Sequence, residues 1–326
     1  MTAVLAYTSP AMGHLYPMMP LLLELRDRGL DVHVRTLDTL VDQARAAGLS
    51  AERIDARLRP IADKHPDWAA TNAKAALERS ATMFAERAVL DGPDFRRAIE
   101  EVDPDLLIVD TNAWGALVVA EAQHRPWLHS DWPSHVISIG AMTWEPPTAP
   151  PAWLADLPDP LTLVTTSSEY QADEALARVA VAALASESGS LVVTMPAGVP
   201  DDLRDLPPNV RVEQFVPHAP LVARAAVAVT HGGMGATQKA LAGGIPVCVV
   251  PYGRDQLETA ARVVHADAGT RLAPKKLTPA ALREAVRAAA GKRAGAAACA
   301  DGFRAAGGAR AAADALLAQL ASPSRR

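Results

Sequence analysis

The residues best suited to chemistry in this chain follow a short apolar run in its second half. The run 227–230 predicts a buried strand, and His231-Gly-Gly-Met-Gly235 turns from it into a predicted helix over 236–242. Glycines let a backbone approach an anion, and the first turn of a helix offers free N–H groups at the positive end of its dipole. The pattern predicts a phosphate site, and Asp255 and Gln256, one strand later, could read a group that the phosphate carries. An ordinary connecting turn is the alternative, because such glycine turns are common in α/β proteins.

A second pair of polar residues lies at the ends of two predicted strands in the first half. His14 follows the predicted strand 3–7, and Asp110 ends the predicted strand 105–109. Ligands of open parallel sheets bind beyond the carboxyl ends of the strands. A carboxylate beside a histidine fixes its tautomer and stabilises the imidazolium, so the pair could form a general base. The alternatives are a loop histidine and an aspartate that caps the next helix.

The elements that must position these residues alternate between strand and helix. This order predicts an α/β fold with parallel sheets and right-handed crossovers. Six prolines within 144–160 predict an interdomain linker between an N-terminal domain, 1–143, and a C-terminal domain, 161–326. Further strands are predicted at 32–36, 161–166, 191–194, 210–215 and 247–250, and helices at 16–28, 39–47, 68–89, 113–123, 170–184, 254–265, 278–290 and 308–321.

Composition excludes several classes of protein. The 326 residues suit two domains of about 150 residues. A net charge of −5 argues against sequence-independent binding to nucleic acid. The two cysteines lack metal or disulfide spacing, which favours a reducing, cytoplasmic location. The first residues resemble a strand rather than a signal peptide, and no apolar run is long enough to span a bilayer.

Several motifs together resemble the family-one GT-B glycosyltransferases that use nucleotide-sugars to modify antibiotic and macrolide natural products. The motifs are AMGHLYPMMPL at 11–21, FVPHAPL at 215–221, HGGMG at 231–235, AGGIP at 242–246 and PYGRDQ at 251–256. The second half of the chain is similar almost throughout, and the first half is similar in its first third and around 105–121. The resemblance implies two facing Rossmann-like domains with the active site in the cleft between them.

The resemblance also implies roles for particular residues. His14 would be the catalytic base and Asp110 its orienting carboxylate. The implied donor-site residues are Ser168 at the phosphates or sugar, Val216 at the nucleobase, His231 with the N–H groups of Gly233, Met234 and Gly235 at the diphosphate, and Asp255 and Gln256 at the sugar hydroxyls. Met12 and Trp114 adjoin the catalytic pair and are candidates for the acceptor pocket, with core packing as the alternative.

These roles amount to an inverting hexosyl transfer. The partners would be a nucleotide-sugar donor and a hydrophobic acceptor, and a homodimer is compatible with the sequence. No metal and no cofactor are expected, because the helix start at 231–235 can stabilise the leaving diphosphate.

Two departures from the family's pattern sharpen this expectation. Many UDP-sugar users carry a ribose-reading glutamate eight residues after the histidine of the HGGMG motif, where this chain has Lys239. A TDP-sugar is therefore favoured over a UDP-sugar. In addition, a helical and loop segment of the acceptor pocket is missing near 135/136, and we favour a disordered segment over a true deletion. An intact mass well above 34.3 kDa would show that it exists.

Two other functions share these features. A sugar-nucleotide 2-epimerase has the same fold but needs no acceptor, and the apolar front motif around Met12 argues against it. A non-catalytic accessory protein that only binds a nucleotide-sugar is the other alternative, if the segment is truly deleted.

Overall fold

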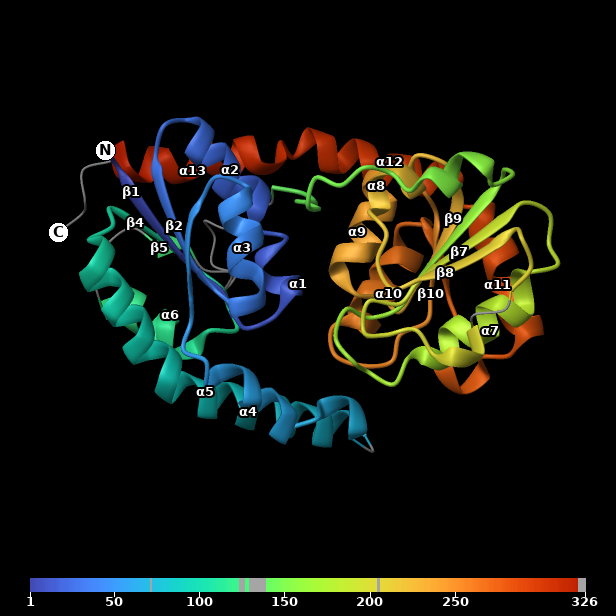
Figure 1. Ribbon diagram of the computed structural model, residues 1–326, viewed down its shortest axis with the longest axis horizontal. Coiled ribbons are helices and arrows are strands. Elements are labelled where there is room, and N and C mark those ends of the chain that lie inside the picture. The colour runs from blue at the N-terminus through green and yellow to red at the C-terminus, as the bar shows by residue number, and fades with distance from the viewer. Residues whose placement is uncertain (71, 123–126, 129–138, 204–205, 322–326) are drawn as a thin grey trace. The chain divides into compact units, whose positions relative to one another are not determined.

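The chain forms two compact units, each built on its own parallel sheet. The computed structural model describes residues 1–70, 72–122, 127–128, 139–203 and 206–321. One unit contains Met1–Trp144 and Ala306–Arg326, and the other contains Glu145–Ala305. Each sheet has helices on both of its faces (Figure 1). The predicted α/β class with two parallel sheets is confirmed.

The sheet of the first unit has the strand order β3-β2-β1-β4-β5. Its strands are β1 Ala3–Tyr7, β2 Asp31–Thr36, β3 Ser50–Arg53, β4 Leu106–Val109 and β5 Trp127–Leu128. Tyr7 is in register with both Arg35 and Val109, so β1, β2 and β4 end at the same edge of the sheet. The residues that follow β1 and β4, including His14 and Asp110, therefore start from neighbouring points.

Alternating side chains of the central strands fill two cores. Val4 and Ala6 face a core with α2, α3 and α13, whereas Leu5 and Tyr7 face a core with α5 and α6. This two-sided burial explains why the central strands are apolar throughout. The helices are α1 Met12–Leu15, α2 Met19–Asp27, α3 Asp38–Ala46, α4 Leu58–Lys64, α5 Ala73–Val102, α6 Trp114–Ala122 and α13 Gly308–Ala321, with a 3-10 turn, η1, at Asp67–Ala69.

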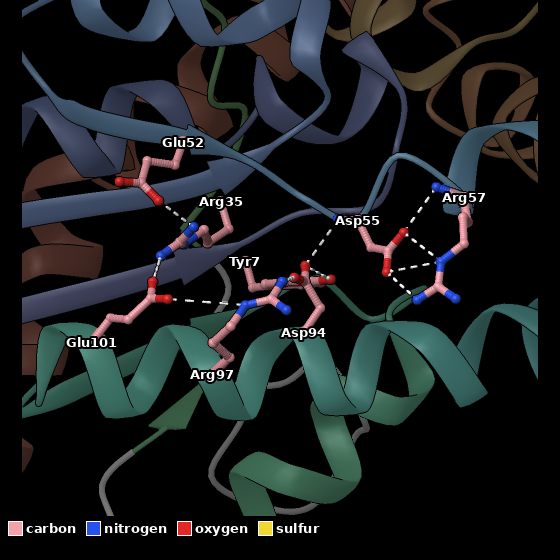
Figure 2. A network of polar contacts seen from close by, with 8 residues as sticks. All are labelled: Tyr7, Arg35, Glu52, Asp55, Arg57, Asp94, Arg97 and Glu101. Carbon is pink, nitrogen blue, oxygen red and sulfur yellow. Dashed lines mark hydrogen bonds and ion pairs between the residues drawn. The ribbon is translucent and has the colours of Figure 1, made fainter.

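The long helix α5 is tied to the sheet by a polar network (Figure 2). The Tyr7 hydroxyl donates to Asp94 Oδ2 at 2.9 Å, and the backbone N–H of Asp55 donates to the same oxygen at 3.0 Å. Arg97 pairs with Asp94 as well, and Arg35 on β2 pairs with Glu101 at the far end of the helix. These contacts hold α5 near the carboxyl ends of β1 and β2, where the segment that leads to α1 and His14 begins.

The sheet of the second unit has the order β11-β10-β9-β6-β7-β8. Its strands are β6 Leu161–Thr165, β7 Ser190–Thr194, β8 Val210–Glu213, β9 Ala225–Thr230, β10 Val247–Val249 and β11 Gly269–Arg271. Its helices are α7 Glu174–Leu184, α8 His218–Val222, α9 Met234–Ala242, α10 Gln256–His265, α11 Pro279–Ala290 and α12 Arg293–Ala305, with 3-10 turns η2 Ala152–Asp156, η3 Asp201–Leu203 and η4 Pro274–Lys276. Thr165 and Thr230 pair in register, so β6 and β9 also end side by side.

The unit boundaries differ from those expected from the sequence. Helix α13 belongs to the first unit, because Ala312, Ala313 and Leu316 are buried in the core with α2. The proline-rich stretch is not a free linker, since Leu154 and Leu157 are buried in the core of the second unit. The expected missing segment near 135/136 lies outside the described residues.

Candidate functional site

In the first unit, His14 and Asp110 form a hydrogen-bonded pair. His14 Nδ1 lies 2.7 Å from Asp110 Oδ2, although the residues are 96 positions apart in the chain. Their side chains are 31% and 6% exposed. A carboxylate at this distance requires Nδ1 to be the donor, which leaves Nε2 as the free base of the neutral ring. The sequence-predicted pair is therefore brought together.

Asp110 is held as a carboxylate by its surroundings. The backbone N–H groups of Ser9 and Asn112 donate to its two oxygens at 3.2 and 2.9 Å. Burial alone would raise the pKa of Asp110, but the adjacent His14 and these backbone donors outweigh it and keep the pKa below its usual value. The histidine thus has an ionised, rigidly held acceptor.

The two candidate acceptor residues have different surroundings. Met12 opens α1 and is half-buried against the core. Trp114 begins α6 and is 41% exposed, and its ring lies 5.3 Å from that of Phe84. Arg87 stacks over the same Phe84 ring at 5.8 Å. An acceptor role for Met12 and Trp114 stays a prediction.

Sequence reasoning missed two buried charges beside this region. Arg87 and Asp91 on α5 are 5% and 1% exposed. Asp91 Oδ1 accepts the backbone N–H of Ala116 at 3.1 Å, and burial raises the pKa of Asp91 to about 6. Burial disfavours the charged form of Arg87 as well, and for this base it lowers the pKa. In the sequence these two residues look like members of an ordinary polar helix face.

In the second unit, the glycine turn brings backbone N–H groups to the start of α9. Gly233 is the N-cap of α9, and no side chain caps this helix among the residues described. Gly232 has φ +93°, and a Cβ there would lie 2.9 Å from Val249. A Cβ on Gly233 would lie 2.2 Å from His231 Nε2, whereas a Cβ on Gly235 would meet nothing within 4 Å. The first two glycines are therefore required by close packing, and the helix start can receive an anion.

His231 is buried beneath this turn. It is 7% exposed, and its Nδ1 has no hydrogen-bond partner among the described residues. Burial lowers the pKa of His231, while the charges of Asp173 and Asp255 and a hydrogen bond with the backbone of Thr165 oppose that effect. An unpartnered buried nitrogen is costly, so a ligand that satisfies it would be favoured.

A buried polar network supports the turn, and most of it could not be predicted from the sequence pattern. Gln256 accepts the backbone N–H groups of Tyr252 and Gly253 at 2.7 and 3.1 Å and donates to Gln171 at 2.6 Å. Gln171 donates to Ser167, whose backbone N–H donates to Asp173. Gln256 is 1% exposed, so its amide lies inside the unit.

The remaining donor candidates vary in exposure. Ser168 follows β6 and is exposed, and Asp255 is exposed at the N-cap of α10. Met234 is 43% exposed at the start of α9. The Val216 side chain is buried in the core, so it could offer a nucleobase only its main chain. Their roles in binding a donor stay predictions.

Lys239 forms an ion pair that the sequence did not indicate. Its Nζ lies 2.7 Å from Glu145 Oε1. The two oxygens of Glu145 also accept the backbone N–H groups of His218 and Ala219 at 2.8 and 3.0 Å. Burial would raise the pKa of Glu145, but these partners hold it below its usual value. Burial and the nearby Lys239 lower the pKa of His218 to about 4.

The described residues contain no group of three or more His, Cys, Asp and Glu side chains that could hold a metal ion. In that same part of the chain, no helix is both long and apolar enough to cross a membrane.

Comparison with known proteins finds a matching family model and several similar proteins. Residues 178–312 match the family described as "Erythromycin biosynthesis protein CIII-like, C-terminal domain". The 4'-demethylrebeccamycin synthase of Lentzea aerocolonigenes is 33% identical over 219 residues, which cover 65% of this chain and 49% of that protein. The 3-alpha-mycarosylerythronolide B desosaminyl transferase of Saccharopolyspora erythraea is 32% identical over 145 residues, which cover 43% of this chain and 34% of that protein. The aligned regions thus span about half or less of these curated relatives.

Among solved structures, the spinosyn rhamnosyltransferase SpnG superimposes with a TM-score of 0.80 at 22% identity, covering 99% of this chain and 100% of that one. Two units with parallel Rossmann-like sheets and this superposition define the GT-B fold. The sequence similarity to the EryCIII-like family covers residues 178–312, and the whole chain shares its fold with SpnG.

Proposed function

We propose that the chain is an inverting, metal-independent glycosyltransferase. It moves a sugar from a nucleotide-sugar to a hydroxyl of a hydrophobic small-molecule natural product. The observation that carries this proposal is the His14–Asp110 pair, 2.7 Å apart at the carboxyl edge of the first sheet. In this proposal the first unit binds the acceptor and the second unit binds the donor.

The reaction follows from the two sites. His14 Nε2 takes the proton of the acceptor hydroxyl, and Asp110 stabilises the resulting imidazolium. The acceptor oxygen attacks the anomeric carbon from the side opposite the diphosphate, which inverts the configuration. The diphosphate leaves against the N–H groups at the start of α9, with His231 and Ser168 beside it. A nucleotide-sugar already carries an activated leaving group, so the reaction needs no further cofactor.

The favoured donor is a TDP-deoxysugar. Lys239 stands where a ribose-reading carboxylate is found in many UDP-sugar users of the family, and it is paired with Glu145. One solved structure with the same fold is the spinosyn rhamnosyltransferase complexed with thymidine diphosphate, at 20% identity and a TM-score of 0.76. Asp255 remains the exposed candidate for the sugar hydroxyls. Gln256 would reach the sugar only by giving up part of its present hydrogen bonding.

A cytoplasmic location fits the two unpaired cysteines, Cys248 and Cys299.

The substitution His14→Ala tests the base. We expect transfer to a hydroxyl acceptor to fall by about 100-fold or more, because general-base catalysis contributes about 10²–10⁴. TDP binding, measured by calorimetry, should be unchanged. His33→Ala is a matched control, since His33 also pairs with an aspartate, Asp31 at 3.0 Å, but on the surface of β2. Near-wild-type turnover of His14→Ala would show that the base is assigned wrongly.

A further inference from the structure

The second unit has an open sheet edge at β8. This strand is the last in the order β11-β10-β9-β6-β7-β8, so among the described residues it has a neighbouring strand on one side only. Leu191 of β7 donates its N–H to the carbonyl of Asn209 at 2.9 Å, and Met195 donates in the same way to Glu213. Successive residues of a strand direct their main-chain groups to opposite sides. Those of Val212 therefore point away from β7, and within the described part of the chain they have no hydrogen-bond partner.

The side chains of β8 separate into an apolar and a charged face. Val210 and Val212 lie on the side of the core that contains α7 and α11. Arg211 and Glu213 lie on the opposite face and are half-buried. Arg211 makes one long hydrogen bond, from Nη1 to the carbonyl of Val210 at 3.4 Å. Among the described residues neither Arg211 nor Glu213 has an ion-pair partner, so both charges are available to a partner strand.

A second copy of β8 fits this edge in one antiparallel register. With Val212 opposite the partner's Val212, each valine donates its N–H to the other and accepts one in return. In that register Arg211 faces the partner's Glu213, and the twofold axis repeats the pair. A register centred on Arg211 would oppose two arginines, and one centred on Glu213 would oppose two glutamates. The charges therefore select the register that uses the free main-chain groups of Val212.

An apolar groove beside the edge would receive the partner's valine. The groove has a volume of about 440 Å³ and runs along residues 210–214. Val199, Leu203 and Leu206 line its other side, and they belong to the same core as Val212. Residues that face each other across two strands point to the same side of a sheet. The partner's Val212 would thus lie over this groove.

We propose that the chain forms a symmetric dimer in which β8 of one protomer pairs antiparallel with β8 of its partner, centred on Val212. The two six-stranded sheets then join into one continuous sheet. The occupant is a second copy because the sequence Arg-Val-Glu is complementary in charge to its own reverse. This inference does not depend on the proposed function. A four-residue strand buries much less than the roughly 1,600 Å² of a standard interface, so we expect a Kd of about 10–100 µM.

Sedimentation velocity of the full chain at increasing concentration tests the dimer through charge reversal. Arg211→Glu sets glutamate against glutamate in both pairs, and Glu213→Arg sets arginine against arginine. Each should weaken association about 10-fold or more. The double variant Arg211→Glu/Glu213→Arg restores both pairs with their order reversed and should associate like the wild type. Arg262→Glu, at an exposed position of α10 in the same unit, is the control and should leave association unchanged.

The decisive sample is an equimolar mixture of the two single variants. Each repels its own copies, but the glutamates of one variant would face the arginines of the other. We expect a heterodimer in the mixture at concentrations where each variant alone is monomeric. That result would also show that both variants are folded. A mixture that associates no more than its separate components would overturn the proposal.

Val212→Pro tests the main-chain pairing. It removes the outward N–H without removing a hydrogen bond to β7, so association should be lost while the circular dichroism of the protein is kept. Val212→Lys, which places a charge over the apolar groove, is the second variant if the proline disturbs folding. A wild-type protein that stays monomeric at about 1 mM would overturn the proposal. A dimer that Arg211→Glu and both Val212 variants leave intact would overturn it too, because it would form through another surface.

Discussion

The two units each place a histidine after a central strand, but they use it differently. His14 follows β1, is partly exposed and donates to a buried carboxylate, Asp110, at 2.7 Å. His231 follows β9 and is buried, and within the described part of the chain its Nδ1 has no hydrogen-bond partner. The nearby carboxylate of Asp173 accepts a backbone N–H of Ser167 instead. The first arrangement suits proton transfer, because the carboxylate polarises one ring nitrogen and the His14 side chain is partly exposed.

The second arrangement suits the holding of an anion. Burial lowers the pKa of His231, so the ring adds no fixed positive charge, and the free N–H groups of α9 supply most of the positive potential. The comparison shows that the first site depends on two side chains, whereas the second depends on main-chain groups kept in place by close packing. The two sites should therefore respond to different kinds of substitution.

The largest expected effect is on the side-chain site. Asp110→Asn keeps the shape of the residue but turns an amide N–H₂ group or a neutral oxygen toward His14, which removes the ionised partner. We expect kcat to fall by about 10⁴-fold, in line with the same substitution in another His–Asp pair, while the Kd for TDP stays constant. A kcat within a few-fold of wild type would break the comparison, because the pair would then be structural only.

The main-chain site should respond to an added methyl group. Gly233→Ala places a Cβ 2.2 Å from His231 Nε2, and the buried ring has no room to move away. We expect TDP to bind about 10- to 100-fold more weakly, corresponding to the loss of one charge-assisted hydrogen bond. Gly235→Ala, with nothing within 4 Å of the new Cβ, should bind TDP normally. Equal effects of the two variants would contradict the packing argument.

A smaller effect concerns the buried charges of the first unit. Burial raises the pKa of Asp91 to about 6, so the native state holds its proton more tightly than the unfolded chain. Stability should therefore fall as the pH rises from about 4 to about 6, by on the order of 3 kcal/mol. Urea denaturation across this range should show that contribution in the wild type and not in Asp91→Asn. Parallel pH profiles of the two proteins would contradict it.

Much of the fold follows from local pattern. The runs 3–7 and 106–109 are wholly apolar and proved to be central strands, and the Thr278-Pro279 start of α11 is the N-cap that the sequence indicated, with Thr278 accepting the N–H of Ala281. The edge strands β3 and β11 were not predicted. In β3 only Ala51 is buried, so an edge strand carries no apolar run that could reveal it.

Helix α5 shows where local rules fail. The pattern predicted an end at 89, before Gly92 and Pro93, yet the helix continues to Val102 with Pro93 inside it. Beyond the proline, Asp94, Arg97 and Glu101 bind Tyr7 and Arg35 of the sheet. These long-range contacts offset the helical hydrogen bond lost at Pro93, and no window of sequence around it contains the partners.

The sequence by itself determined the α/β class, the glycine turn at 231–235, and the candidates His14 and Asp110, because strand periodicity and glycine chemistry are local properties. Only the tertiary structure decided that His14 meets Asp110, that Lys239 is paired with Glu145, and that α13 belongs to the first unit. Each of these pairings joins residues more than 90 positions apart. The register of the strands and the packing of the helices set such distances, and neither is a property of the residues' neighbours in sequence.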